Sequence, residues 1–270
     1  MITLTWIRSL VTAGALGALA SPVTAQSIAD AVSRRGDGQV RFSFTLRDGV
    51  CGYGSNISTY RRNEPKPNMR QYGDRRSRDV EYDFDCEPGP GRVAMDVEGG
   101  KVYAMRFYVG GRWRQRDSVT DLGMVNTKQA SDYLLTLAQT SEGKAGRDAV
   151  FPLSLVDSVT VWPSLIKLAR DESRPRETRK NAVFWLGQAA EEPATRGLDE
   201  LVGEAALDRD VRESAIFALS QRPKDEGVPA LIKVVRSNKD PEMRKKALFW
   251  LGQSNDPRAL DLIEELLAKR

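Results

Sequence analysis

Alternating acidic residues and two arginine-rich segments are the parts of this sequence whose side chains could do chemistry. In VEYDFDCE (80–87) every second residue is acidic: Glu81, Asp83, Asp85 and Glu87. In a strand these carboxylates would share one face, with Cys86 on the apolar face. Such a stripe could bind Ca²⁺ or, inside a pocket, hydrolyse a glycosidic bond. We favour a simpler interpretation, cross-strand ion pairing with neighbouring arginines.

Arginines for that pairing stand in RWRQR (112–116). On a strand Arg112, Arg114 and Arg116 would share one face, opposite Trp113. If the basic and acidic stripes are neighbours, they neutralise each other on the solvated face of a sheet. We therefore expect no metal ion and no cofactor in this part of the chain.

The segment 57–79 is a second basic region, with Tyr60 and Tyr72 interleaved among its charges. Residues 26–125 carry 17 basic and 14 acidic side chains, whereas residues 126–270 carry 23 of each. Arginine and tyrosine together could bind an anionic envelope polymer or a lipid headgroup; the alternative is a solvated loop, which we favour. The candidate anion-binding residues are Arg61, Arg62, Lys66, Arg70, Arg75, Arg76 and Arg78.

Histidine is absent from all 270 residues, and Cys51 and Cys86 are the two cysteines. Without histidine, serine–histidine and cysteine–histidine catalysis are excluded, and the usual general base near neutral pH is missing. Two cysteines cannot complete a tetrahedral zinc site. We expect a protein that is not an enzyme, with a Cys51–Cys86 disulfide if the chain is exported.

Residues 1–25 have the features of a secretory signal peptide. Arg8 precedes the apolar run Leu10 to Ala20, and small residues stand at Val23 and Ala25. The run has 11 residues, and a membrane span needs roughly 20. We expect cleavage after Ala25 and an exported protein, periplasmic or secreted, that is not transmembrane and has no nucleic-acid partner.

Period-two alternation predicts that residues 26–125 form a small, disulfide-bonded antiparallel β domain. About five strands are expected, with hairpin turns at Gly99–Gly100 and Gly110–Gly111. Their ranges are 40–46, 80–87, 92–97, 101–109 and 112–116.

One phrase returns four times after residue 145. AVFPLS (149–154), AVFWLGQ (182–188), AIFALS (215–220) and ALFWLGQ (247–253) are spaced by 32 or 33 residues. Such a period is typical of stacked helical repeats. In the last three copies an alanine stands four residues before a leucine, which places both on one helical face. The pattern predicts helical hairpins with alanine, leucine and phenylalanine in the core, and Arg179, Arg212 and Arg244 bonded across neighbouring units.

The lead-in and first helix of the last unit, with Asp240, Pro241, Arg244, Ala247, Leu251 and Gly252, resemble those of HEAT-like repeats. The resemblance covers about 145–270 and implies an α-solenoid of about four hairpins that binds another protein without chemistry of its own. Residues 126–144 are expected to form a linking or capping helix and a joint. The fold class expected is therefore α+β, with two domains.

Six residues of the repeats are candidates for a partner surface. Lys167, Glu200, Lys233 and Glu265 alternate in sign along the second helices. They could form a ladder of surface ion pairs, which we favour, or a charge-coded groove. Trp185 and Trp250 could stack on a ligand, although packing in the core or at its rim is the simpler interpretation. We expect an exported, non-enzymatic adaptor with a protein partner; the alternative is an anionic-polymer or lipid binder acting through 57–79.

Overall fold

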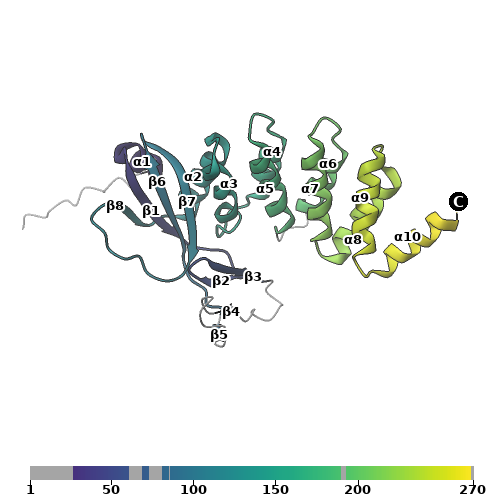
Figure 1. Ribbon diagram of the computed structural model, residues 1–270, viewed down its shortest axis with the longest axis horizontal. Coiled ribbons are helices and arrows are strands. Elements are labelled where there is room, and N and C mark those ends of the chain that lie inside the picture. The colour runs from purple at the N-terminus through teal and green to yellow at the C-terminus, as the bar shows by residue number, and fades with distance from the viewer. Residues whose placement is uncertain (1–26, 61–68, 73–80, 85, 190–192, 269–270) are drawn as a thin grey trace, which may run out of the picture.

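A four-stranded mixed sheet forms the N-terminal part of the protein. The structure, a computed structural model, describes residues 27–60, 69–72, 81–84, 86–189 and 193–268. Helix α1 (Ile28–Arg35) precedes a sheet of strand order β7-β6-β1-β8 (Figure 1). Its strands are β1 (Gly38–Phe44), β6 (Gly91–Glu98), β7 (Lys101–Val109) and β8 (Val119–Met124). β1 pairs antiparallel with β6 and parallel with β8.

The sheet has one apolar and one polar face. Val40, Phe42 and Phe44 of β1 are fully buried, as are Val93 and Met95 of β6, and all five belong to one hydrophobic core with α1 and the later helices. The residues that alternate with them point to the opposite face. That face carries Gln39, Arg41, Ser43, Arg92, Asp96 and Arg106.

The prediction of a strand at 112–116 is wrong, because those residues form a loop. Gly110 and Gly111, with φ of 64° and 66°, begin this loop instead of a hairpin turn. The next strand is β8, which lies beyond β6 and β1 in the sheet, so the chain has to cross both strands to reach it. During the crossing Trp113 packs against two arginines of the polar face, Arg41 and Arg92. The predicted turn at Gly99–Gly100 does connect β6 to β7.

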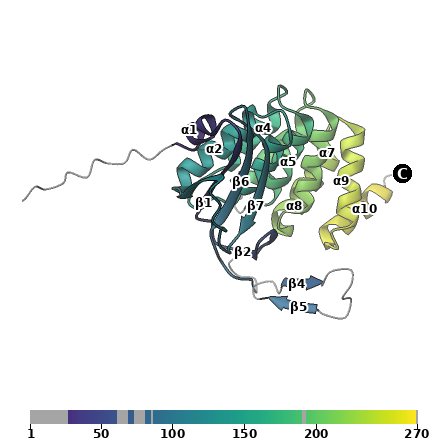
Figure 2. The same cartoon turned by 60° about the vertical axis from the view of Figure 1, so that its left-hand side comes forward.

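The predicted strand 80–87 does not join the main sheet. β5 (Glu81–Phe84) pairs with β4 (Met69–Tyr72) in a separate two-stranded sheet, which projects away from the main sheet in Figure 2. Because 112–116 is a loop, the expected cross-strand pairing of the acidic stripe with Arg112, Arg114 and Arg116 is also wrong. Asp85 of that stripe lies outside the described residues.

A third small sheet carries the disulfide. β2 (Val50–Tyr53) pairs antiparallel with β3 (Asn56–Thr59). Cys51 of β2 is bonded to Cys86, with a Cα–Cα distance of 5.2 Å, as the sequence predicted. Both cysteines are buried.

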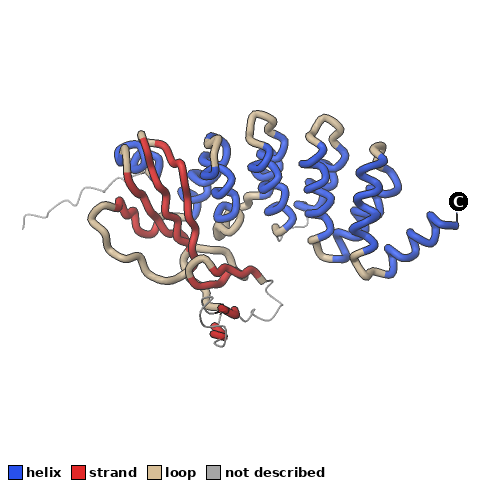
Figure 3. The backbone as a smooth tube through the Cα atoms, viewed as in Figure 1, coloured by secondary structure: helices blue, strands red, loops and turns tan. Residues whose placement is uncertain are grey.

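Four helical hairpins follow the linking helix α2 (Thr127–Thr140) in the described part of the chain, as predicted. Figures 1 and 3 show them side by side in a row that leads away from the sheet. The hairpins are α3 (Lys144–Leu153) with α4 (Trp162–Arg170), α5 (Arg176–Gly187) with α6 (Pro193–Gly203), α7 (Arg209–Ser220) with α8 (Lys224–Ser237), and α9 (Pro241–Gly252) with α10 (Pro257–Ala268).

One hydrophobic core runs from the sheet through the hairpins. The repeated alanines, Ala182, Ala215 and Ala247, are completely buried between helices. α2 packs against α3 and α4, and α3 packs against β7, so the sheet and the first hairpin are joined by tertiary contacts. Among the described helices, none has the length and apolar character required to cross a membrane.

Candidate functional site

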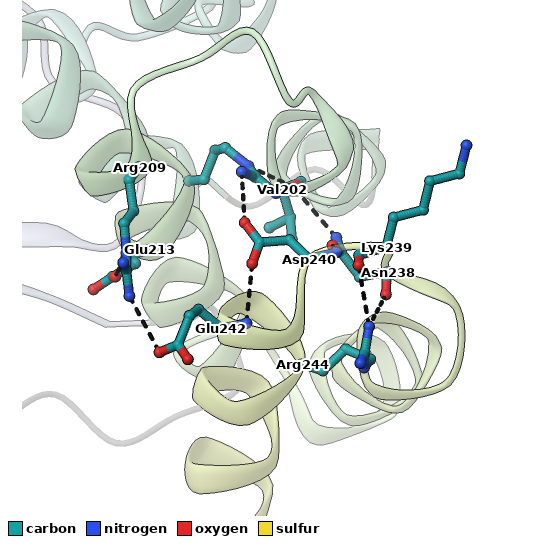
Figure 4. A network of polar contacts seen from close by, with 9 residues as sticks. Val202, Arg209, Glu213, Asn238, Lys239, Asp240, Glu242 and Arg244 are labelled. Atoms are coloured by element: carbon teal, nitrogen blue, oxygen red, sulfur yellow. Dashed lines mark hydrogen bonds and ion pairs between the residues drawn. The ribbon is translucent and has the colours of Figure 1, made fainter.

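An arginine near the start of α7 holds three successive hairpins in register. The Arg212 side chain is almost fully buried. Its Nε donates to the carbonyl of Val202 in α6 at 3.1 Å, and its Nη1 donates to Oδ2 of Asp240, just before α9, at 3.0 Å. Figure 4 shows Val202 and Asp240 within this network. A single guanidinium therefore connects the second, third and fourth hairpins.

Arginines occupy the equivalent position in the second and fourth hairpins, as Arg179 and Arg244. Arg179 pairs with Asp208 of the next lead-in segment, so the predicted bonding across units is confirmed for Arg179 and Arg212. Arg244 differs, because it donates to the carbonyls of Asn238 and Lys239 in the segment that leads into its own helix, at 2.8 and 3.2 Å (Figure 4).

Asp240 also caps α9. Its Oδ1 accepts the N–H of Glu242 at 2.9 Å, and Pro241 occupies the first helical position, where the missing N–H costs nothing. The N–H of Glu242, followed by the Arg212 guanidinium, lowers the pKa of Asp240 below its usual value. The carboxylate is therefore ionised at neutral pH, at the end of the helix where the macrodipole favours a negative charge.

Aromatic side chains form a row across the first helices of all four hairpins, which we call the aromatic strip. The rings of Phe151 and Trp185 stack at 4.2 Å between centroids, and those of Phe184 and Phe217 lie nearly parallel at 6.4 Å. Phe217 lies 5.0 Å from Trp250. The strip consists of Phe151, Phe184, Trp185, Phe217, Phe249 and Trp250.

The strip is most exposed at the last hairpin. Phe151 is half-buried under Phe107 of β7, with a centroid distance of 5.6 Å. Phe184 is 36% exposed and Phe249 is 56% exposed. The prediction that the repeated phenylalanines fill the core is therefore wrong for these two. Each stands two positions after its buried alanine, which turns its side chain about 200° away from that helix face.

Trp185 and Trp250, for which the sequence left open stacking on a ligand or the favoured packing in the core or at its rim, both belong to the strip. Trp185 stacks on Phe151, and Trp250 lies against Phe217 and Phe249. Trp250 also lines a cavity of about 210 Å³ at the turn between α7 and α8. The sequence analysis assigned the phenylalanines of the repeated phrase to the core and therefore missed them as candidates for a surface. Their fixed position in each repeat was the available signal.

Three of the four charged candidates on the second helices form ion pairs with other residues of these helices. Lys233 pairs with Asp199 at 2.5 Å. Arg170 bonds Glu200 at 3.0 Å and Arg236 bonds Glu265 at 2.7 Å. Lys167 is exposed. Such exposed pairs contribute little to stability.

Most candidate anion-binding residues of the segment 57–79 lie outside the described residues; they are Arg61, Arg62, Lys66, Arg75, Arg76 and Arg78. Arg70 belongs to β4. In the described ranges no group of three or more aspartate, glutamate, histidine or cysteine side chains is placed to hold a metal ion. The Ca²⁺ alternative includes Asp85, which lies outside the described residues, so that alternative stays a prediction.

Comparison with known families bears on the helical part of the chain. Residues 198–270 match the family model of HEAT repeats. No curated protein matches the sequence. The match begins within α6 and includes the third and fourth hairpins, and α3 to α6 continue the same arrangement toward the N-terminus. The helical region is therefore built from HEAT-like repeats.

Proposed function

We propose that this chain, whose helical region is a HEAT-like solenoid, is an exported, non-enzymatic scaffold that binds another protein through the aromatic strip. The HEAT-like repeats support a protein-interaction role. The position of the contact surface, the export and the absence of catalysis are part of the proposal.

The exposure of the aromatic strip is the observation that carries it. Aromatic residues are enriched among the side chains that contribute most to protein–protein binding. In the last hairpin Phe249 is 56% exposed and Trp250 lies beside it, at a centroid distance of 5.1 Å. The rings already pack against one another, so little conformational freedom remains to be lost when a partner covers them.

The remaining features fit a scaffold in an oxidising compartment. The Cys51–Cys86 disulfide is compatible with export. The chain lacks histidine, and the buried Arg212 is engaged in holding hairpins together. Mass spectrometry of the protein from its own cells tests the export proposal, since a cleaved signal peptide predicts a chain that begins at Gln26.

Site-specific photocrosslinking tests the contact surface. A photoreactive phenylalanine replaces Phe249 in one variant and Tyr103, which is 57% exposed on β7, in a matched control. In cells that make the protein, the proposal expects one crosslinked protein from position 249 and none, or a different set, from position 103. Equal crosslinking from both positions would indicate general stickiness and would remove the support for the strip.

Affinity measurements with the purified partner give a second test. Phe184→Ala with Phe249→Ala is expected to weaken binding about tenfold or more, because buried aromatic contacts dominate interface energies. Leu260→Ala with Leu267→Ala is the control, since both leucines are more than 60% exposed on α10. Unchanged thermal stability of both variants would show that the strip acts in binding. Equal loss of affinity in both would contradict the proposed surface.

A further inference from the structure

A cavity of about 500 Å³ lies on the polar face of the main sheet, under the loop that crosses from β7 to β8. Its floor comes from three strands, because Arg41 of β1, Ala94 of β6 and Arg106 of β7 stand opposite one another in the register. Residues 110–114 and Arg116 of the crossing loop form its wall. The cavity therefore joins residues that are more than 60 positions apart in the sequence.

Trp113 and Arg92 hold this wall in place. The indole of Trp113 lies under the guanidinium carbons of Arg41 and Arg92, at 5.0 and 5.7 Å from the ring centroid, and meets Tyr108 edge-on at 6.0 Å. Arg92 donates to the carbonyls of Gly110 and Gly111, both at 2.8 Å. The loop is thus attached to the sheet by cation–π contacts and hydrogen bonds, which give the wall of the cavity a defined position.

The lining is strongly cationic. Among the described residues it contains six arginines: Arg41, Arg92, Arg106, Arg112, Arg114 and Arg116. Two of them are paired with carboxylates, Arg41 with Asp121 and Arg106 with Asp96, each at 2.8 Å. Four of the six lining arginines thus have no carboxylate bonded to them in the described part of the chain.

The loop arginines are available to a ligand. Arg112, Arg114 and Arg116 are exposed, and their side chains make no ion pair or hydrogen bond with another described residue. Arg92 lies deeper, where burial and the charge of Arg41 lower its pKa, while Asp121 acts in the opposite direction. Guanidinium groups cannot lose their proton in proteins, so this positive charge persists at every physiological pH.

From this arrangement we infer that the arginine cavity binds a ligand with a diphosphate or oligophosphate group. The ligand must carry its negative charge within a small volume. A cavity of about 500 Å³ accepts a small molecule or a headgroup but not a folded chain. Phosphate oxyanions match the guanidinium fork in bidentate geometry and carry several acceptor oxygens on one centre. Tyr53, 69% exposed at the rim, offers a flat apolar surface to whatever carries the phosphates.

Calorimetric titration of the mature protein with pyrophosphate and with tripolyphosphate tests this inference directly. Citrate is the comparator, because it is a compact trianion whose charge comes from carboxylates. We expect both phosphates to bind at a single site, more tightly than citrate, with affinity that falls as salt is raised. Affinity for citrate equal to that for tripolyphosphate would overturn the assignment to phosphate, and no binding by either phosphate would overturn the site.

Two sets of Arg→Gln variants test whether phosphate binds in the arginine cavity. Arg112→Gln, Arg114→Gln and Arg116→Gln together should weaken phosphate binding on the order of 100-fold, because charge-assisted hydrogen bonds are lost. Arg176→Gln, Arg209→Gln and Arg236→Gln remove the same charge from the exposed surface of the hairpins and should leave the affinity unchanged. Equal weakening by both sets would mean that only net charge matters and would refute the cavity.

Two further measurements identify the tryptophan that responds to the ligand and the kind of molecule that carries the phosphates. Phosphate should change the tryptophan fluorescence of the parent protein, and Trp113→Phe should remove that change, because Trp113 lines the cavity. Vesicles containing a lipid whose headgroup is a diphosphate, set against neutral phosphatidylcholine vesicles, test a lipid source. Diphosphate binding without vesicle binding assigns a soluble ligand, whereas binding to both assigns a phosphorylated headgroup. The aromatic strip lies on other elements, so these results are independent of the protein-binding proposal.

Discussion

Replacing Arg212 by methionine should weaken the joint between three hairpins. The substitution keeps most of the side-chain length but removes the donors to Val202 and Asp240. Hydrogen bonds that involve a charged group contribute about 1.5–3 kcal/mol each. The Val202 carbonyl keeps a long contact of 3.4 Å with Asn238, and Asp240 keeps its bond to Glu242 and some access to water. We therefore expect a loss near the lower end of the combined range of about 3–6 kcal/mol, that is, about 3 kcal/mol.

The control for this experiment stands one helical turn earlier in α7. Arg209 pairs with Glu213 at 2.9 Å and with Glu242 at 3.2 Å, but its side chain is 59% exposed (Figure 4). Exposed ion pairs contribute little, so Arg209→Met should leave the stability almost unchanged.

Equilibrium unfolding in urea, followed by circular dichroism and by tryptophan fluorescence, measures both variants. A loss of about 3 kcal/mol corresponds to a fall in melting temperature of roughly 6–12 °C for a chain of this size. Hairpins in a solenoid are stabilised by their neighbours. If the last hairpin of Arg212→Met unfolds first, circular dichroism and tryptophan fluorescence should therefore give different transition midpoints. Equal transition midpoints for Arg212→Met and Arg209→Met would refute the reasoning.

Three further outcomes follow from single groups. Removing the disulfide with Cys51→Ser and Cys86→Ser opens a loop of 35 residues and should cost roughly 3–4 kcal/mol in chemical unfolding of the β region. Burial raises the pKa of Tyr133 to about 12. The stability linked to its neutral form is present below about pH 10 and is lost as the pH rises through 12. An ultraviolet titration should therefore show one tyrosine that ionises at higher pH than the others, and Tyr133→Phe should remove that step. The Arg258 side chain lowers the pKa of Asp256 to about 2. The stability that this carboxylate gives to α10 is full above about pH 4 and is lost as the pH falls through 2, so the protection of the α10 amides, corrected for their intrinsic exchange rates, should fall in acid in the parent protein and depend less on pH in Asp256→Asn.

The sequence was sufficient for the hairpins and the disulfide because each depends on a regular or unique signal. Buried alanine and leucine recur every 32 or 33 residues, and a chain with two cysteines allows one pairing. Neither inference required knowledge of distant contacts.

The β region was harder because its arrangement depends on tertiary contacts. RWRQR alternates like a strand, but Trp113 is held by Arg41 and Arg92 on the sheet. β8 is largely exposed and lacks the alternation that identifies a strand; its position is set by the free edge of β1. The arginine cavity could not be predicted for the same reason, since strand register brings Arg41 and Arg106 to one place.

The phenylalanine of the repeated phrase links stability to the proposed binding. It occurs in all four hairpins, as Phe151, Phe184, Phe217 and Phe249, although the adjacent tryptophan position also holds proline and alanine. Core packing would explain a phenylalanine that is buried, but Phe249 leaves more than half of its surface in water. Stacking between neighbouring rings contributes about 0.5–1.5 kcal/mol for each pair, and it fixes the rings in one orientation. The hairpins therefore present an ordered apolar surface whose exposed end lies far from the sheet, where a protein partner can reach it without contacting the arginine cavity (Figure 1).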